Sequence, residues 1–392
     1  MTANLLPVMR IVHYSDLHIA SSKFAQQHAQ MKSLMTKLPH WANQGLECAD
    51  TSALDEFVDF LADLAGDPAW KGLPLWLVDT GDGTTFGDPD SLGEWRDDWS
   101  PRFLQAAGSD ASQLLLYGNH DAWPGTYPLL APANMDLQRR QLRAAPWFSD
   151  TYPGAPLTAV ISGPSQVQLY ALNSVDHRLM ASVKAAGRVD EDRFWEKPPA
   201  RPASPALAAA QDLKARIAAA ANAVPGVPHF RILAMHYPVC DKAIPKRLTE
   251  VLTNRRGFAD EIKPPPGQPD PVIHLLLAGH THAGYPLIGA MPGGATAVAH
   301  APLELGQLQL VTPSLSQVNS LPPPPPTASH AEQTLYDYPH QCTVLNVHAS
   351  VAGPLEIVLE RRIAGRDVGG VFGYLPLVAG SQRNHETISF VI

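Results

Sequence analysis

The feature that most constrains the fold is a series of short apolar segments, each of which ends in polar residues. Their length, and the polar and glycine residues that follow them, indicate buried β-strands. Predicted helices fall between several of these segments, and strands that alternate with helices indicate an α/β fold. The predicted strands are residues 9–14, 74–78, 114–117, 167–172, 230–235 and 272–278. The predicted helices are residues 51–65, 135–144 and 206–223.

The C-terminal part of the chain has a different pattern. Residues 308–311, 343–347 and 355–360 are further short apolar segments, and Gly353-Pro354 marks a turn between the last two. Strands that are joined by a short turn pair in the antiparallel direction. We therefore expect the fold to finish with antiparallel strands.

Polar side chains that can bind metal follow five of the earlier strands. In open α/β sheets, ligand sites form outside the carboxyl ends of the strands, so residues far apart in the sequence are expected to meet there. The pattern therefore predicts one cluster at this edge. Its members are Asp16, His18, Asp82, Asn119, His120, His236, His280 and His282.

Single members of these motifs also have ordinary structural explanations. Gly118 and Gly279 can simply allow a positive φ angle, and one isolated His236 is more often a hydrogen-bonded core residue than a ligand. Their occurrence together and in order favours a functional site. For Asp121 the favoured role is to tie down a loop, whereas packing and substrate contact remain equal alternatives for Tyr237.

The donor types in the cluster indicate metal chemistry. Imidazole, carboxylate and amide ligands without thiolate suit Zn, Mn or Fe better than a soft metal. Two such ions about 3.5–4 Å apart lower the pKa of a bridging water and neutralise the attacking and leaving oxygens of a phosphate ester. The amide of Asn119 is neutral, so it binds a metal without cancelling charge. His120 follows it directly and is the candidate general acid, or a donor to the phosphate.

Five motifs occur in a fixed order along the chain. They are Asp16-Leu17-His18, Gly81-Asp82, Gly118-Asn119-His120-Asp121, His236 and Gly279-His280-Thr281-His282. Together they resemble the calcineurin-like metallophosphoesterases. The resemblance implies a four-layer α/β/β/α sandwich of two mixed sheets flanked by helices, with two divalent or trivalent metal ions. It implies a first metal held by Asp16, His18, Asp82 and His282. It implies a second metal held by Asp82, Asn119, His236 and His280, with Asp82 bridging and His120 as the catalytic histidine.

The chain departs from the family pattern at one position near this site. The family commonly has an acidic residue three places after the bridging aspartate, which orients the catalytic histidine. Here that position is Thr85, and Asp88 or Asp121 are the candidates to replace the missing carboxylate.

The resemblance also divides the chain. It places a metallophosphoesterase domain at residues 1–363, with insertions near residues 21–70 and 196–228, where extra segments can cap the site. Residues 364–392 are expected to form a C-terminal tail.

The favoured function is hydrolysis of a phosphate ester by attack of a metal-bridging hydroxide, with a phosphodiesterase as the first choice. Residues 187–195 contain Gly-Arg-Val and Asp-Arg-Phe-Trp, which resemble bacterial cyclic-nucleotide phosphodiesterases. A phosphomonoesterase acting on nucleotides or sugar phosphates is the second hypothesis. A metal-binding scaffold without turnover is the third, and the presence of His120 argues against it.

Composition limits the partners. The net charge is −8 and no basic run occurs, so we expect a small phosphate ester, including nucleotides, and no duplex nucleic acid. The sequence shows no signal peptide and no apolar run near the ~20 residues that span a bilayer, so no membrane association is expected. The 3 cysteines cannot form a disulfide framework, which suits the cytoplasm. The oligomeric state remains open.

Overall fold

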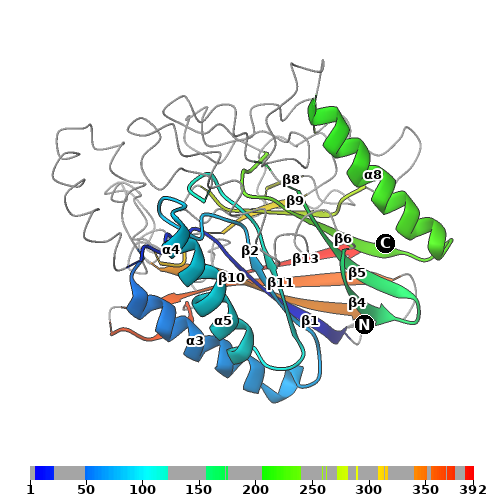
Figure 1. The fold of residues 1–392 in the computed structure, drawn as a ribbon. Helices are drawn as coiled ribbons and strands as arrows, with labels where there is room; N and C mark the ends of the chain where they lie inside the picture. The colour runs from blue at the N-terminus through cyan, green and yellow to red at the C-terminus, as the bar shows by residue number, and fades with distance from the viewer. Residues whose placement is uncertain are drawn as a thin grey trace, which may run out of the picture.

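The computed structural model describes residues 5–21, 49–121, 156–172, 174, 205–239, 258, 262, 272–280, 288–289, 308–312, 314–316, 340–350, 355–367, 369–375 and 385–392. These residues form two β-sheets and the helices that cover them (Figure 1). The predicted helix at residues 135–144 and the stretch at residues 187–195 lie outside the described residues.

The first sheet is built around the N-terminal strand. Its strands lie in the order β12-β11-β10-β1-β2-β3, and β13 also pairs with β11. β1, β2 and β3 are parallel, whereas β10 to β13 are antiparallel additions. The bounds are β1 (Leu5–Tyr14), β2 (Leu75–Asp79), β3 (Ala111–Leu115), β10 (Gln341–Ser350), β11 (Glu356–Arg366), β12 (Phe372–Tyr374) and β13 (His385–Val391). The predicted antiparallel finish is confirmed for residues 343–347 and 355–360, which lie in β10 and β11. It is wrong for residues 308–311, which belong to the second sheet and pair there in parallel with residues 275–278.

The second sheet has a parallel centre and antiparallel edges. Its order is β4-β5-β6-β7-β9-β8, in which β5, β6, β7 and β9 run parallel while β4 and β8 are antiparallel to their neighbours. The bounds are β4 (Leu157–Ser162), β5 (Ser165–Ala171), β6 (His229–Ala234), β7 (Leu275–Ala278), β8 (Ile288–Gly289) and β9 (Leu308–Val311). The carboxyl ends of its parallel strands therefore share one edge of the sheet.

Helix α3 (Thr51–Gly66) belongs to the connection between the parallel strands β1 and β2, which must cross over the sheet. The Asp50 side chain accepts a hydrogen bond from Ser52 N and caps its first turn. The buried side of the helix meets β1, where the Tyr14 ring lies 5.5 Å from the Phe57 ring. Its buried apolar residues repeat at helical spacing and are Ala53, Leu54, Phe57, Phe60, Leu61 and Leu64.

The remaining helices complete the layers. α5 (Ser100–Ala106) packs beside α3, and α8 (Pro205–Ala223) buries Leu213 and Ile217 in the core. Figure 1 shows α3 and α5 on one side of the pair of sheets and α8 on the other. The predicted α/β architecture, two mixed sheets flanked by helices, is confirmed. Shorter helical turns are η1 (Pro68–Trp70), α4 (Pro89–Gly93) and the π-helical turn η2 (Glu94–Trp99).

None of the helices in the described part of the chain has both the length and the apolar composition that a membrane crossing requires.

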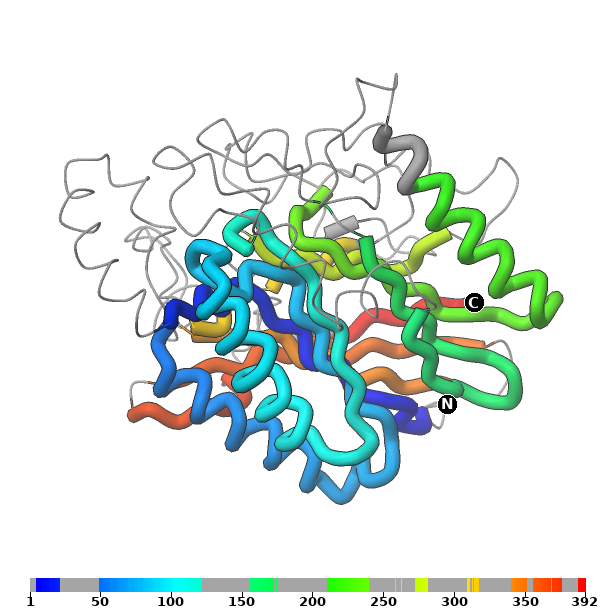
Figure 2. Tube along the Cα trace, viewed as in Figure 1, coloured from blue at the N-terminus to red at the C-terminus, as the bar shows by residue number. Residues whose placement is uncertain are grey.

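The C-terminal residues take part in the first sheet. The boundary predicted after residue 363 falls inside β11, which continues to Arg366. β12 and β13, both from the predicted tail, pair with β11, and in Figure 2 the orange and red C-terminal segments lie beside the blue N-terminal strand. The Phe390 ring of β13 lies 4.9 Å from the Phe230 ring of β6. The described part of residues 364–392 therefore contributes to the core between the sheets.

Replacement of Phe390 by alanine tests this contribution. Because the ring is buried between the two sheets, the change should lower the free energy of unfolding by about 3–5 kcal/mol. The measurement is denaturant unfolding followed by circular dichroism. Val391→Ala is the control, since the Val391 side chain is exposed and its loss should cost at most about 0.5 kcal/mol. Equal stability of the two variants would show that the C-terminal strand does not support the core.

Candidate metal centre

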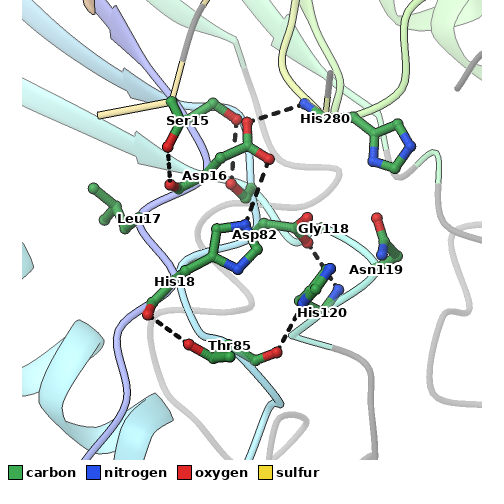
Figure 3. Close-up of polar contacts among 12 residues, drawn as sticks. Ser15, Asp16, Leu17, His18, Asp82, Thr85, Gly118, Asn119, His120 and His280 are labelled. Atoms are coloured by element: carbon green, nitrogen blue, oxygen red, sulfur yellow. Dashed lines mark hydrogen bonds and ion pairs between the residues drawn. The ribbon is translucent and has the colours of Figure 1, made fainter. Parts of the chain in front are cut away.

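The loops that follow β1 and β2 are bonded to each other through their main chains. Asp16 N donates to Gly81 O at 2.8 Å, and His18 N donates to Asp82 O at 3.0 Å. Because β1 and β2 are parallel neighbours, their carboxyl ends lie at one edge of the sheet. Figure 3 shows the side chains of these loops gathered there with residues from the loops after β3 and β7.

The structure brings the described members of the predicted cluster together at this edge. Asp16 Oδ2 accepts from His280 N at 3.1 Å, which joins the first sheet to the second. Every described member of the cluster is buried except His280, which is half-buried. His282 lies outside the described residues. The residues that meet are Asp16, His18, Asp82, Asn119, His120, His236 and His280.

Four cluster members have an unusual backbone conformation. The φ angles are 57° at Asp16, 51° at His18, 55° at Asp82 and 69° at His280. Among the described residues these are the only non-glycine residues with positive φ. Such a conformation costs roughly 1–3 kcal/mol per residue and persists only where the surroundings impose it. The strain thus coincides with the predicted ligands.

Two motif glycines are required for close approach. A Cβ atom at Gly118 would lie 2.0 Å from Asp82 Oδ1, and one at Gly279 would lie 1.9 Å from Ser15 Oγ. Any side chain at either position would displace the neighbouring loop. These glycines therefore allow the four loops after β1, β2, β3 and β7 to meet around Asp82 and Asp16.

The His236 ring shows why a cation suits this site. Its Nδ1 lies 2.7 Å from Thr80 O, and a carbonyl only accepts, so Nδ1 carries a proton. The other nitrogen, Nε2, lies 3.1 Å from Asn119 Oδ1, 3.3 Å from Asp82 Oδ2 and 3.2 Å from His280 Nδ1. In the neutral ring Nε2 holds a lone pair that faces the oxygens of Asn119 and Asp82, so electron-rich atoms converge from three residues. A positive charge among them, a proton or a metal ion, relieves their repulsion.

The pKa values of His236 and Asp82 also indicate that the site suits positive charge. Burial by itself would lower the pKa of His236, but the charge of Asp82 and its hydrogen bond outweigh burial and raise the pKa to about 9. Burial would likewise raise the pKa of Asp82, yet His236, His120 and His18 hold it well below the usual range of an aspartate. The site therefore keeps a buried carboxylate ionised and attracts positive charge.

The donors fall into two groups that share Asp82. One ligand atom each from His18, Asp82 and His120 lies within 4.8 Å of the others, and the same holds for Asp82, His236 and His280. Carboxylate, imidazole and amide donors suit Zn, Mn or Fe. The Thr80 carbonyl that holds the His236 ring is the kind of outer contact that orients a metal-binding histidine. The residues present fit a metal centre with Asp82 as the shared ligand.

His120 is held by one carboxylate and one main-chain carbonyl. Its N donates to Asp82 Oδ1 at 2.8 Å, and its Nδ1 lies 2.7 Å from Thr85 O, so Nδ1 carries the proton. A main-chain carbonyl thus makes the orienting contact at the position where the resemblance led us to expect a carboxylate. The Thr85 side chain instead donates to His18 O at 2.6 Å.

The two carboxylates considered as substitutes bond elsewhere. Asp88 accepts from Ser91 N and caps α4. Asp121 accepts from the main chain of Gly83, Thr84 and Gly118. Burial, with the nearby charge of Asp82, raises the pKa of Asp121 to about 7. As expected, Asp121 ties the loops together.

Tyr237 is a site residue whose role the sequence did not decide. Its hydroxyl donates to Asn119 Oδ1 at 3.2 Å, and its ring centroid lies 4.0 Å from that of His280. Burial raises the pKa of Tyr237 well above its usual value, so the hydroxyl stays a donor. The only sequence signal was its position directly after His236. The structure shows that it contacts two candidate ligands, Asn119 and His280.

Comparison with known proteins agrees with this description. A family model described as calcineurin-like phosphoesterase matches residues 9–284. Comparison with curated proteins found no significant match.

Two solved structures are similar to the chain at low identity. One is GAP50, described as the anchor in the inner membrane complex of Plasmodium, with 11% identity, a TM-score of 0.42, and coverage of 95% of this chain and 90% of that chain. The other is the phosphopantetheinyl hydrolase PptH from Mycobacterium tuberculosis, with 14% identity, a TM-score of 0.33, and coverage of 79% and 90%.

Replacement of Tyr237 by phenylalanine tests its contact with Asn119. Loss of the hydroxyl should free the amide to rotate and weaken Mn²⁺ binding about tenfold, as for other outer contacts of metal ligands. Isothermal titration of metal-free protein with Mn²⁺ measures this. Tyr170→Phe is the matched control, because that buried hydroxyl donates to Gln168 Oε1 within β5. Unchanged affinity in Tyr237→Phe would mean that packing is its whole role.

Proposed function

The chain belongs to the calcineurin-like phosphoesterase family, and on that premise we propose that it hydrolyses phosphate diesters at a centre of two metal ions. The observation that carries this proposal is the convergence of electron-rich atoms around the buried Asp82. His236 Nε2 lies 3.1 Å from Asn119 Oδ1 and 3.3 Å from Asp82 Oδ2, in a chain whose family is metal-dependent. A cation placed among these atoms would relieve their repulsion.

The residues divide between the two ions as the family resemblance implies. Asp82 contributes to both, because both groups of converging donors contain it. His282, the remaining ligand in this assignment, lies outside the described residues. The first ion would be held by Asp16, His18, Asp82 and His282. The second ion would be held by Asp82, Asn119, His236 and His280.

When bound, the metals lower the pKa of a water molecule and neutralise the charge of the phosphate oxygens. The protein holds these ligands in place before substrate binds. Main-chain bonds join the loops of Asp16, His18 and Asp82, and the Thr80 carbonyl orients His236. The site therefore needs little rearrangement during the reaction, which favours stabilisation of charge in the transition state.

His120 is the proposed catalytic residue. Its Nδ1 is engaged by Thr85 O, so Nε2 is the nitrogen that can exchange a proton with bound substrate. In the protonated form Nε2 can donate to a phosphate oxygen or give its proton to the leaving alkoxide. A carbonyl stabilises the imidazolium less than a carboxylate does, because it carries no net charge.

The preference for diesters is supported by the stretch at residues 187–195, which resembles cyclic-nucleotide phosphodiesterases and lies outside the described residues. Monoester hydrolysis and a scaffold without turnover are the competing outcomes of the test.

An activity panel separates these outcomes. Mn²⁺-loaded protein should hydrolyse bis-p-nitrophenyl phosphate faster than p-nitrophenyl phosphate, and cyclic AMP faster than AMP. A chelator should abolish turnover, and added Mn²⁺ should restore it. Asp82→Ala, which removes the shared ligand, should lower kcat/KM by more than about a thousandfold and serves as the blank. Faster monoester turnover would favour a phosphomonoesterase, and no turnover with two metals bound would favour the scaffold.

Replacement of His120 by glutamine tests the catalytic assignment separately. The variant should retain metal stoichiometry while kcat falls roughly 100- to 1,000-fold, the usual loss on removal of a general acid. Metal content by atomic emission and steady-state kinetics provide the two readouts. Loss of a metal ion from this variant would instead make His120 a ligand, consistent with its closeness to His18 and Asp82.

A further inference from the structure

The loop after β1 is held through its main chain by several segments. Asp16 N and His18 N donate to the loop after β2. His18 O accepts from Ala49 N at 2.9 Å and from Thr85 Oγ1 at 2.6 Å. Because buried main-chain groups need partners, these bonds define much of the loop's conformation. They leave the carbonyls of residues 15, 16 and 17 to be satisfied from elsewhere.

Three consecutive residues, the 314–316 segment, satisfy those three consecutive carbonyls. Leu315 N donates to Ser15 O at 3.1 Å. Ser314 Oγ donates to Asp16 O at 2.8 Å, and Ser316 Oγ donates to Leu17 O. All three residues of the segment are buried. The family model ends at residue 284, so this contact comes from beyond the matched region.

The segment is itself fixed at both ends. Ser314 O accepts from Gln341 N at 2.9 Å, at the start of β10, and Ser316 O accepts from Asp50 N at 3.1 Å, at the cap of α3. These bonds fix the segment, and with it the loop after β1, relative to β10 and α3.

The bonded carbonyls control the strained angles directly. A peptide group is planar, so turning the group that contains Leu17 O changes φ of His18. Turning the group that contains Asp16 O changes ψ of Asp16, which positions the rest of the loop relative to its carboxylate. Asp16 and His18 have φ angles of 57° and 51°, a conformation from which the chain relaxes unless it is held. Ser314 and Ser316 supply part of that constraint.

We propose that Ser314 and Ser316 are positioning residues of the metal centre, which hold the backbone of Asp16 and His18 in the geometry that binds a metal ion. The proposal depends on one part of the proposed function, namely that the site binds metal. The two hydroxyls act on the loop that carries Asp16 and His18. Loss of either hydroxyl should therefore weaken the metal site that contains Asp16 and His18 more than the other site.

Mn²⁺ titration of metal-free Ser314→Ala and Ser316→Ala, by calorimetry with electron paramagnetic resonance of free Mn²⁺, tests this. At a Mn²⁺ concentration that just fills both sites of the wild-type chain, each variant should leave about half of the weakened site empty. The affinity of the weakened site should fall about tenfold, as for other outer contacts. Ser316→Ala should have the larger effect, because its carbonyl partner sets φ of His18.

Thr312→Val is the matched control. Thr312 Oγ1 donates to the carbonyl of His13 within β1 at 3.0 Å, so this variant also loses a buried hydroxyl–carbonyl bond, but outside the ligand loop. It should lower the melting temperature without changing Mn²⁺ affinity. Ser314→Cys and Ser316→Cys keep a similar side-chain size and a weaker donor, and should bind Mn²⁺ with intermediate affinity. Because Mn²⁺ does not prefer thiolate ligands, these variants also serve if an alanine variant fails to fold.

The outcomes are distinct. Serine variants that keep both ions within about twofold of wild-type affinity, while losing thermal stability as Thr312→Val does, would overturn the positioning role and leave the proposed function intact. A wild-type protein that binds no Mn²⁺, Zn²⁺ or Fe²⁺ would overturn the metal centre and the positioning role together.

Discussion

The buried carboxylate of Asp82 is the group around which the site is organised. Removal of a charged carboxylate from water costs several kcal/mol unless positive or polar partners replace the lost hydration. Here Oδ1 accepts from His120 N and Oδ2 faces His236 Nε2. Gly118 lies so close that a single added carbon would meet Oδ1. The carboxylate is thus enclosed by three loops, and its charge explains why histidines gather there and why the site suits a metal ion.

Enclosure of this group requires a backbone that would not be stable alone. Asp16, His18, Asp82 and His280 all have positive φ angles, and each such residue adds strain that other bonds must offset. The loops bond to one another across the carboxyl ends of β1 and β2, and the 314–316 segment completes the constraint from the C-terminal side. Strain and rigidity occur together because a centre of fixed charges works best when its ligands are already in place.

The C-terminal third of the molecule accordingly serves the site as well as the core. β10 lies directly against β1, and its first residue, Gln341, bonds to Ser314. β13 extends the sheet beyond β11 and places Phe390 against Phe230 of the second sheet. The sequence motifs end at His282, so they do not show that the residues after 363 belong to the same sheet. β12 and β13 nevertheless join it, because strands pair through the backbone groups at the edges of a sheet and not through motifs.

The sequence by itself determined the α/β class, most of the strands and the residues that meet at the candidate centre. These depend on local patterns: apolar segments of strand length, and polar residues at their carboxyl ends, which parallel pairing brings to one edge. Tertiary structure alone decided how the candidate ligands are held. The Thr85 carbonyl at His120, the Tyr237 hydroxyl at Asn119 and the serines at Asp16 and Leu17 are single contacts, and the serine contacts join residues 298 and 299 positions apart. No periodicity encodes such contacts, because a hydroxyl or a carbonyl is present at many positions and only the packed chain selects which one is near.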